Sequence, residues 1–401
     1  MFGFKNKRIY LDYAAAAPQL SIARAAFLKG QSLIGNASSI HKDGIAVKKA
    51  LEEARIVVAK SISAHADEIV FTATGTESDN LAILGVFKEA VLGAKIKKPH
   101  IITTAIEHPA VLEACRHIES VGGEVTYVMP DEQGLINPKD VRAALKPETI
   151  LVTVIYANNE IGTIAPIREI AKVIRQYKKE TDSAYPLFHS DACQAAQYVN
   201  MNVEQLGVDL LTFSGVKMGA GFGAAALYVK RKTPIASNGY GGGQEGGLRS
   251  GTPNVAAASA FAAACLEVMT NTEKETERLT ALRDYFFDEV SKRWAGVRIN
   301  GSRAERLPNN MHISFSNITS ELLVLELDAK GISASAGSAC SATEQSESEV
   351  LAALYGKGDG KKWGSVRFSM GPQTTKKDLD TVLFTLEKIF KKYESVKSFR
   401  N

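Results

Sequence analysis

Cysteine is scarce in this chain. Only four of the 401 residues are cysteine, at positions 115, 193, 265 and 340, and no two of them have the Cys-x-x-Cys spacing of a metal-binding knuckle. The sequence therefore indicates neither a structural zinc site nor a disulfide framework. We predict no metal site.

Strong charge and long apolar runs are lacking as well. The net charge of +4 is slight for this length, and no basic cluster is interleaved with aromatic residues. Direct nucleic-acid binding thus has no electrostatic support. No apolar run follows the basic N-terminal residues, and the Ala-rich stretch from Val255 to Met269 is too short and interrupted to span a bilayer. We expect no membrane association and a cytoplasmic location.

Apolar strands alternate with amphipathic helices between Glu68 and Val229. Strands are expected at 68–72, 101–104, 124–128, 150–155, 187–190, 210–214 and 224–229, and helices at 45–62, 76–91, 109–120 and 166–178. This alternation predicts an α/β fold whose mostly parallel sheet is covered by helices on both faces.

A second, smaller α+β unit is expected after the Gly-rich segment 239–247, because the chain exceeds one comfortable core. Its expected elements are helices 254–269 and 273–293, strand 311–315, helix 319–330, strand 365–369 and helix 376–393. No internal repeat is present.

Two motifs at strand ends carry chemistry. Asp191-Ala-Cys-Gln194 follows one strand and Ser214-Gly-Val-Lys217 the next. A buried carboxylate can keep a pyridine nitrogen protonated, and a lysine can form a Schiff base with an aldehyde, so the pair points to pyridoxal phosphate. Each motif alone has a plainer interpretation, since Asp191 could cap a helix and Lys217 could be a solvated loop residue.

Three further segments support this interpretation. Gly75 and Thr76 stand between a strand and a helix, where backbone N–H groups and the helix dipole favour a phosphate. His108 precedes Pro109 at another strand-to-helix junction, where a histidine can stack on a ring and move protons. The turn Asn158-Asn159 closes a third strand.

In order and spacing these segments resemble the class V branch of the fold type I pyridoxal phosphate enzymes, and within it the cysteine desulfurases of the housekeeping iron–sulfur and thiolation branch. The stretch Ser335-Ala-Gly-Ser-Ala-Cys340-Ser is similar to the loop that carries the family's nucleophilic cysteine. Further matching stretches are Tyr10-Leu-Asp12-Tyr13-Ala14-Ala15, Gly35-Asn36-Ala-Ser38-Ser39-Ile-His41, Gly241-Gly-Gly-Gln-Glu, Leu248-Arg249-Ser250-Gly251-Thr252 and Val366-Arg367-Phe-Ser-Met-Gly371.

The resemblance implies a reaction and a role for each residue. L-Cysteine becomes L-alanine, Cys340 takes the sulfur as a persulfide, and a sulfur-acceptor protein of iron–sulfur assembly or tRNA thiolation receives it. Lys217 binds the cofactor, Arg367 and Asn159 hold the substrate carboxylate, and His108 stacks on the ring and moves protons. Other expected cofactor contacts are Gly75, Thr76, Asp191, Gln194, Ser214 and, from the second subunit of a homodimer, Thr252. The implied domains are 15–268, which binds the cofactor, and 1–14 with 269–401, which carries the Cys340 loop.

The other three cysteines are expected to play no part in the chemistry. Cys115 and Cys265 lie on predicted helices and are interpreted as small core residues. Strand alternation should turn Cys193 away from the ligand. Cys340 lies among Ser, Ala and Gly, as in an accessible loop, although an incidental surface thiol is the alternative.

The chain departs from the family pattern around the cofactor. Val216 stands where the family has His, Ala16-Ala17 where it has Thr-Thr, Gly246 where it has Arg, and Ala220-Gly-Phe-Gly223 where it has Gly-Pro-Lys-Gly. Weaker cofactor binding or a shifted substrate is therefore an alternative. A selenocysteine lyase or another class V enzyme, and a decayed scaffold for sulfur-transfer partners, remain open as rival functions.

Overall fold

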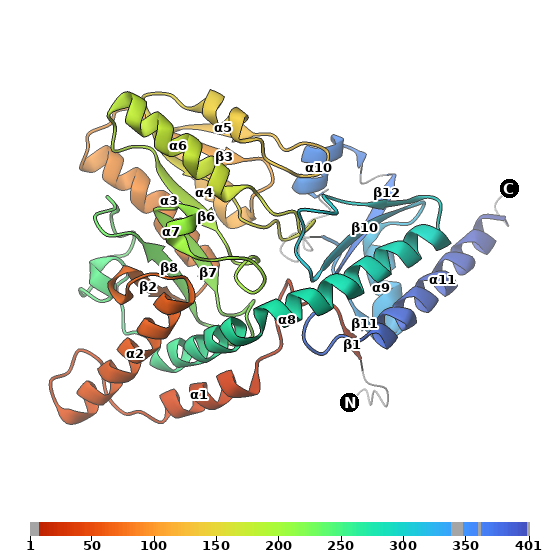
Figure 1. Cartoon of the computed structure of the whole chain (residues 1–401), viewed down its shortest axis with the longest axis horizontal. Coiled ribbons are helices and arrows are strands. Elements are labelled where there is room, and N and C mark those ends of the chain that lie inside the picture. The colour runs from red at the N-terminus through yellow and green to blue at the C-terminus, as the bar shows by residue number, and fades with distance from the viewer. Residues whose placement is uncertain (1–7, 338–347, 360–361, 399–401) are drawn as a thin grey trace.

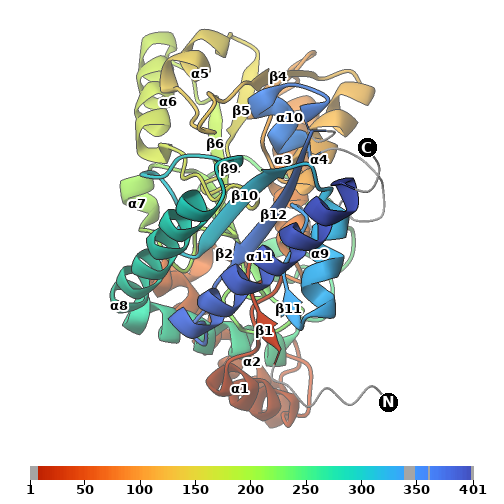
Figure 2. The ribbon, with the colours of Figure 1, turned by 90° about the vertical axis from the view of Figure 1, so that its right-hand side faces the viewer.

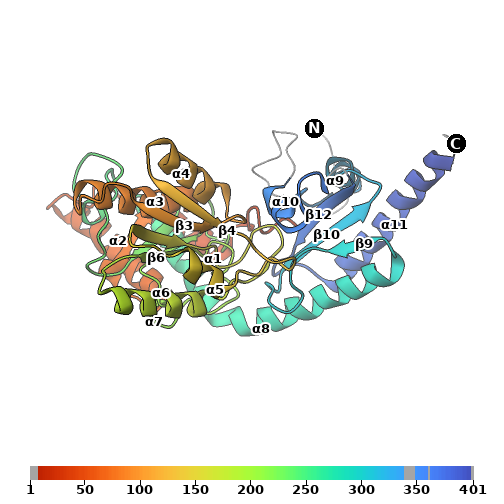
Figure 3. The same ribbon diagram turned by 90° about the horizontal axis from the view of Figure 1, so that it is seen from above.

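The computed structural model describes residues 8–337, 348–359 and 362–398. These residues form a large α/β unit and a smaller unit, connected by the long helix α8 (Val255–Arg293) (Figure 1). Seen from above, the two units lie side by side and α8 runs along both (Figure 3).

A seven-stranded sheet forms the centre of the large unit. Its strand order is β2 (Ile69–Thr72), β8 (Ala225–Val229), β7 (Leu210–Ser214), β6 (Leu187–Asp191), β5 (Thr149–Thr153), β3 (His100–Thr104) and β4 (Glu124–Val128). Only the two pairings made by β8 are antiparallel. The mostly parallel sheet predicted from the sequence is therefore confirmed.

Helices bury both faces of this sheet. The helices of the large unit are α1 (Ser21–Gln31), α2 (Lys42–Ser61), α3 (Gly75–Leu92), α4 (Pro109–Ser120), α5 (Pro138–Ala144), α6 (Ile167–Thr181) and α7 (Val203–Leu206), with the short 3-10 turns η1 (Ala66–Glu68) and η2 (Glu245–Gly247). Neighbouring strand residues point to opposite faces: Ile101 packs in the cluster with α3 and α4, and Ile102 in the cluster with α2, α6 and α8. A fully apolar strand is thus buried on both sides, as in other parallel sheets.

The small unit contains a three-stranded antiparallel sheet. Its order is β12 (Trp363–Ser369), β10 (Asn310–Ser316) and β9 (Val297–Ile299). Helices α9 (Ser320–Ala329) and α11 (Lys376–Ser398) lie over this sheet in Figure 2, and α10 (Glu349–Tyr355) lies nearer the large unit. The N-terminal strand β1 (Ile9–Tyr10) pairs in parallel with β11 (Ile332–Ser333), so the start of the described chain joins the small unit.

Helix α8 differs from the sequence prediction. Two helices were expected at 254–269 and 273–293, but one helix of 39 residues runs through both. The hydroxyls of Thr270 and Thr272 donate to the carbonyls of Leu266 and Val268, at 2.9 and 2.6 Å, so these residues continue the helix instead of breaking it. The expected domain boundary at residues 268 and 269 lies inside this helix, and the division into domains stays a prediction.

The same helix is longer than the apolar stretch recognised in the sequence. Among the described residues, α8 is the one helix whose length and mean hydropathy would suffice to cross a membrane. Half of its most apolar window is buried inside the protein, and its N-terminal half packs against α1 and α2. This packing is typical of a core helix.

Candidate active site

One cavity of about 250 Å³ lies at the carboxyl ends of β2, β6 and β7 and reaches across to the small unit. Such ends of parallel strands form the ligand crevice of open α/β sheets. Nine of the residues expected from the sequence line it: Gly75, Thr76, His108, Asn159, Asp191, Gln194, Ser214, Lys217 and Arg367. Segments separated by almost 300 residues are thus brought together.

The first turn of α3 forms one end of the cavity. The hydroxyl oxygen of Thr74 caps the helix by accepting the N–H of Glu77 at 3.1 Å. Within the described part of the chain, the N–H groups of Gly75 and Thr76 have no hydrogen-bond partner. Together with the hydroxyl of Ser214, which lies beside Gly75, they can receive an anion.

Cys193 lies in this cavity, and the expectation that it would point away is wrong. Strand β6 ends at Asp191, and the chain turns there because the Asp191 carboxylate accepts the N–H of Cys193 at 2.9 Å. Strand alternation therefore does not extend to position 193. The thiol lies so close to Gly75 that a Cβ at position 75 would approach its sulfur to 2.7 Å, which explains the glycine there.

Lys217 and Gln194 both reach the N-terminal segment. The Lys217 Nζ donates to the carbonyls of Ala14 and Ala15 at 2.8 and 2.7 Å, and the Gln194 amide donates to Ala14 at 2.9 Å. The amine and the amide are thereby held at the cavity wall. The second hydrogen of the Gln194 amide can be donated to a ligand.

His108 caps helix α4 from the cavity side. Its Nδ1 accepts the N–H of Ala110 at 3.1 Å. Burial lowers the pKa of His108. Asp191 raises this pKa to a smaller extent, and Lys217 lowers it further. The ring is therefore neutral near pH 7, and its proton lies on Nε2, the nitrogen available to a ligand.

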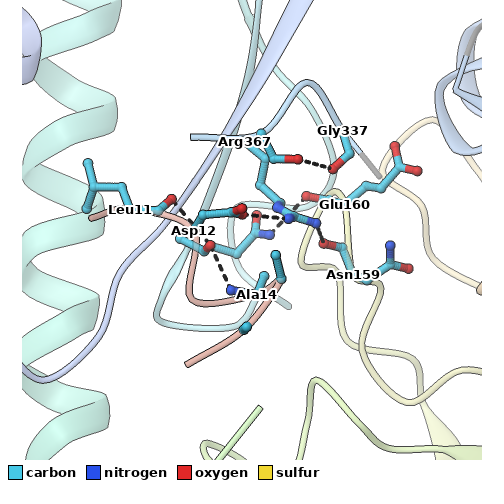
Figure 4. A network of polar contacts seen from close by, with 12 residues as sticks. Leu11, Asp12, Ala14, Asn159, Glu160, Gly337 and Arg367 are labelled. Atoms are coloured by element: carbon cyan, nitrogen blue, oxygen red, sulfur yellow. Dashed lines mark hydrogen bonds and ion pairs between the residues drawn. The ribbon is translucent and has the colours of Figure 1, made fainter. Parts of the chain in front are cut away.

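Arg367 on β12 brings the small unit into the site. Its guanidinium is buried and lies between Asp12 and Asn159, donating to the Asp12 carboxylate at 2.9 Å and to the Asn159 carbonyl at 2.7 Å (Figure 4). Asn159 was expected to act through its side chain. In this structure its backbone carbonyl holds Arg367, while its side-chain oxygen has no hydrogen-bond partner among the described residues.

Cys340 lies outside the described residues, but both flanks of its segment are fixed beside Arg367. The backbone of Ser335 pairs with that of Arg367 in both directions, at 2.8 and 3.1 Å. At the other flank, the Ser348 hydroxyl donates to the buried Glu160 carboxylate at 2.6 Å. The residues on either side of the segment that contains Cys340 are thus held close to the cavity.

Several residues of the site were not assigned a role from the sequence. Asp12 pairs with Arg367, and the buried acids Asp79 and Glu107 lie in or beside the cavity. Burial raises the pKa of Glu107 to about 8. Asp79 stands among the polar residues of the first turns of α3, so no local signal in the sequence indicates that its carboxyl is buried.

Some of the departures from the family pattern line the cavity, whereas Ala16, Ala17 and Gly246 do not. Val216 and Phe222 line the cavity, and Phe222 is 83 % exposed at its mouth. Thr252 is exposed and does not line the cavity of its own chain, so its contribution to a second subunit stays a prediction. The described residues contain no cluster of potential metal ligands.

The chain is similar to known proteins over nearly its whole length. The model of the aminotransferase class V family matches residues 9–382. The cysteine desulfurase IscS of Dictyoglomus turgidum is 43 % identical over 98 % of each chain, and that of Clostridium botulinum strain Hall is 39 % identical over 96 % of this chain and 95 % of the relative.

Solved structures give the same result. A NifS-like protein superposes with a TM-score of 0.85 at 30 % identity, covering 98 % of this chain and 100 % of its own. SspA, solved in complex with cysteine, superposes with a TM-score of 0.78 at 30 % identity, covering 92 % of this chain and 100 % of its own. The resemblance recognised in the sequence is therefore confirmed, and the chain belongs to the class V aminotransferase family, in the group of the cysteine desulfurases.

Proposed function

We propose that this protein is a pyridoxal-phosphate-dependent cysteine desulfurase that converts L-cysteine to L-alanine and keeps the sulfur as a persulfide on Cys340. The observation that carries the proposal is the convergence of Lys217, Asp191 and Arg367 on one cavity. An amine, a buried carboxylate and a guanidinium in one cavity are the groups that bind an aldehyde cofactor and its amino-acid substrate.

The residues present fit this cofactor. The unpartnered N–H groups of Gly75 and Thr76 suit its phosphate, Asp191 suits its ring nitrogen, and Lys217 supplies the amine that binds its aldehyde. Bound there, pyridoxal phosphate would draw electron density away from the substrate carbons next to the amino group. Gln194 can donate its second amide hydrogen to the ring hydroxyl while the first stays on Ala14.

Arg367 and His108 handle the substrate. The fork of Arg367 would bind the substrate carboxylate in a fixed orientation, because Asp12 and the Asn159 carbonyl already hold the guanidinium in place. His108, neutral near pH 7, can give or take a proton at Nε2.

The sulfur step is balanced without any external oxidant. The Cys340 thiolate attacks the substrate sulfur, the bond from that sulfur to the substrate β-carbon breaks, and its electron pair stays on the carbon. That carbon then takes a proton, which gives alanine and a Cys340 persulfide. The structure of SspA in complex with cysteine supports cysteine as the ligand of this site.

We further propose a cytoplasmic homodimer that delivers its sulfur to an acceptor protein of iron–sulfur cluster assembly or tRNA thiolation. Large apolar side chains stand out from the large unit, among them Ile34, Ile40 and Tyr240, which are 83, 94 and 87 % exposed. Apolar groups exposed to this degree support a contact between subunits. Thr252 would then reach the cofactor of the second subunit.

Cofactor loading followed by a product assay tests the proposal. The protein with added pyridoxal phosphate should develop an absorbance band near the visible edge and, with cysteine and a thiol reductant, release alanine and sulfide in equal amounts. Lys217→Ala should lose both properties. Loss of the band in the parent protein would favour a decayed scaffold, while turnover of selenocysteine but not of cysteine would favour a lyase.

A further inference from the structure

Asp79 is a buried acid in the cavity with no place in the mechanism above. It lies in the second turn of α3, is 1 % exposed and lines the same cavity as Asp191. Its Oδ1 has no hydrogen-bond partner among the residues that the structure describes. An ionised carboxylate buried without a partner is strongly destabilising, so Asp79 requires either a cation or a proton.

Within the described ranges, no lysine or arginine forms an ion pair with Asp79. The basic group beside it is His189, with Nε2 at 3.7 Å from Oδ1. Both ring nitrogens of His189 already contact hydroxyls, Nδ1 that of Thr153 at 2.8 Å and Nε2 that of Thr212 at 3.1 Å. Burial lowers the pKa of His189 to about 3, so this ring is neutral at the pH of the cell.

The other titratable groups around the cavity do not supply the charge either. Burial keeps Glu107 mostly protonated at neutral pH, keeps the thiol of Cys193 protonated and keeps His108 neutral. The Lys217 ammonium is directed at two backbone carbonyls. On α3 itself, Glu77 is engaged in an ion pair with an arginine.

Asp79 and Asp191 therefore form an acid pair, and the two carboxyl groups have different donors. Asp191 accepts the backbone N–H of Cys193 at 2.9 Å, whereas Oδ1 of Asp79 accepts no hydrogen bond from the described residues, and the Thr212 hydroxyl only partly offsets the effect of burial on the pKa of Asp79. Two neighbouring buried carboxyls share one negative charge, and the charge goes to the one with the better donor. Burial, and then Asp191, raise the pKa of Asp79 well above its ordinary value.

We propose that Asp79 is a positioning residue for the desulfurase reaction: it carries the proton of the acid pair and so keeps the single negative charge on Asp191, where the ring nitrogen of the cofactor would lie. This inference rests on the proposed function for its cofactor. It predicts that Asp79 takes over the charge when Asp191 can no longer ionise.

A double-mutant cycle on cofactor affinity tests this prediction. The dissociation constant of pyridoxal phosphate is measured by absorbance titration for the parent protein, Asp79→Asn, Asp191→Asn and the double variant. Asp79→Asn alone keeps the neutral state and should change the affinity by less than about threefold. In the Asp191→Asn background the same substitution removes the remaining charge and should weaken binding by about tenfold or more. Equal effects in the two backgrounds would overturn the proposal, and Asp140→Asn on the exposed side of α5 is the control.

Thermal unfolding without cofactor gives an independent readout. An acid whose pKa is raised by folding stabilises the protein at low pH, and this contribution is lost as the pH rises from about 3.9, the unfolded value, through the folded pKa. The unfolding temperature of Asp79→Asn minus that of the parent should therefore increase from pH 5 to pH 8. A constant difference overturns the proposal.

The two readouts separate the possible failures. If the parent binds no pyridoxal phosphate, the proposed function fails while the unfolding comparison still tests the acid pair. If Asp79→Asn does not fold, Asp191→Asn replaces it, because removing the neighbouring charge should shift the pH dependence of unfolding to lower pH. An unchanged pH dependence in Asp191→Asn would refute the acid pair.

Discussion

Replacing Val216 with histidine should tighten the binding of pyridoxal phosphate. The side chain of Val216 lines the cavity between Ser214 and Lys217, whereas its backbone carbonyl accepts the N–H of Ala17 at 3.0 Å. The substitution therefore changes a side chain that faces the ligand and leaves the backbone bond intact. A valine offers the phosphate no donor at this position.

The size of the effect follows from the donors already present. The Gly75 and Thr76 N–H groups, the Thr76 hydroxyl and the Ser214 hydroxyl can bind the phosphate, so the parent protein should hold its cofactor. One additional hydrogen bond to a charged group contributes roughly 1.5 to 3 kcal/mol. This range corresponds to about ten- to a hundredfold in affinity.

Cofactor dissociation during dialysis, followed by absorbance, measures the difference between the parent and Val216→His. Val216→Leu is the matched control, because it adds bulk without a donor and should not tighten binding. Val216→Thr adds a short hydroxyl and should give an intermediate result. If the parent already retains cofactor as firmly as Val216→His, another group has replaced the histidine and the reasoning from Val216 fails.

Four further outcomes are expected. Borohydride reduction of the loaded enzyme should leave a pyridoxyl adduct on Lys217 by mass spectrometry, and an adduct on another lysine would contradict the geometry of the cavity. Cys340→Ser should still bind cysteine, seen as a change in the cofactor spectrum, yet release no alanine above a trace; turnover at the parent rate would favour the lyase. Arg367→Lys should raise the KM for cysteine by about ten- to a hundredfold with a smaller change in kcat, because the planar fork is lost; an unchanged KM in steady-state assays would remove Arg367 from substrate binding. The unfolding temperature of Glu107→Gln minus that of the parent should increase as the pH rises from 5 to 8. The reason is that burial raises the pKa of Glu107 to about 8, so the fold favours the neutral form of this carboxyl. A difference in unfolding temperature that does not depend on pH would show that Glu107 is ionised.

The large sheet could be predicted from the sequence because most of its strands lie in short segments rich in apolar and β-branched residues. The same local signals placed Gly75, His108, Asp191 and Lys217 at strand ends, which is where the cavity lies. Parallel strands must present their carboxyl ends at one edge, so a motif after each strand was enough to predict a common site.

Contacts between distant segments could not be predicted in this way. Strands β1 and β11 have two residues each, and the pairing of Ile9 with Ile332 has no local signal. The position of Cys193 was predicted wrongly because alternation was extended beyond the end of a strand. The continuity of α8 was missed because threonine and asparagine are common in turns. The same residues can also stand inside a helix when their side chains bond to backbone carbonyls one turn earlier.

The N-terminal segment has a consequence for the synthesis of the protein. Asp12 pairs with Arg367, a residue 355 positions later, and Ile9 pairs with Ile332. At about 5 to 20 residues per second, a ribosome makes Arg367 about 20 to 70 seconds after Asp12. Ala14 and Ala15 can meet Lys217 well before that time, so this wall of the cavity can form on the nascent chain. The contact between Asp12 and Arg367 can form only after Arg367 has been made, so the small unit closes the cavity after the Lys217 wall is already in place.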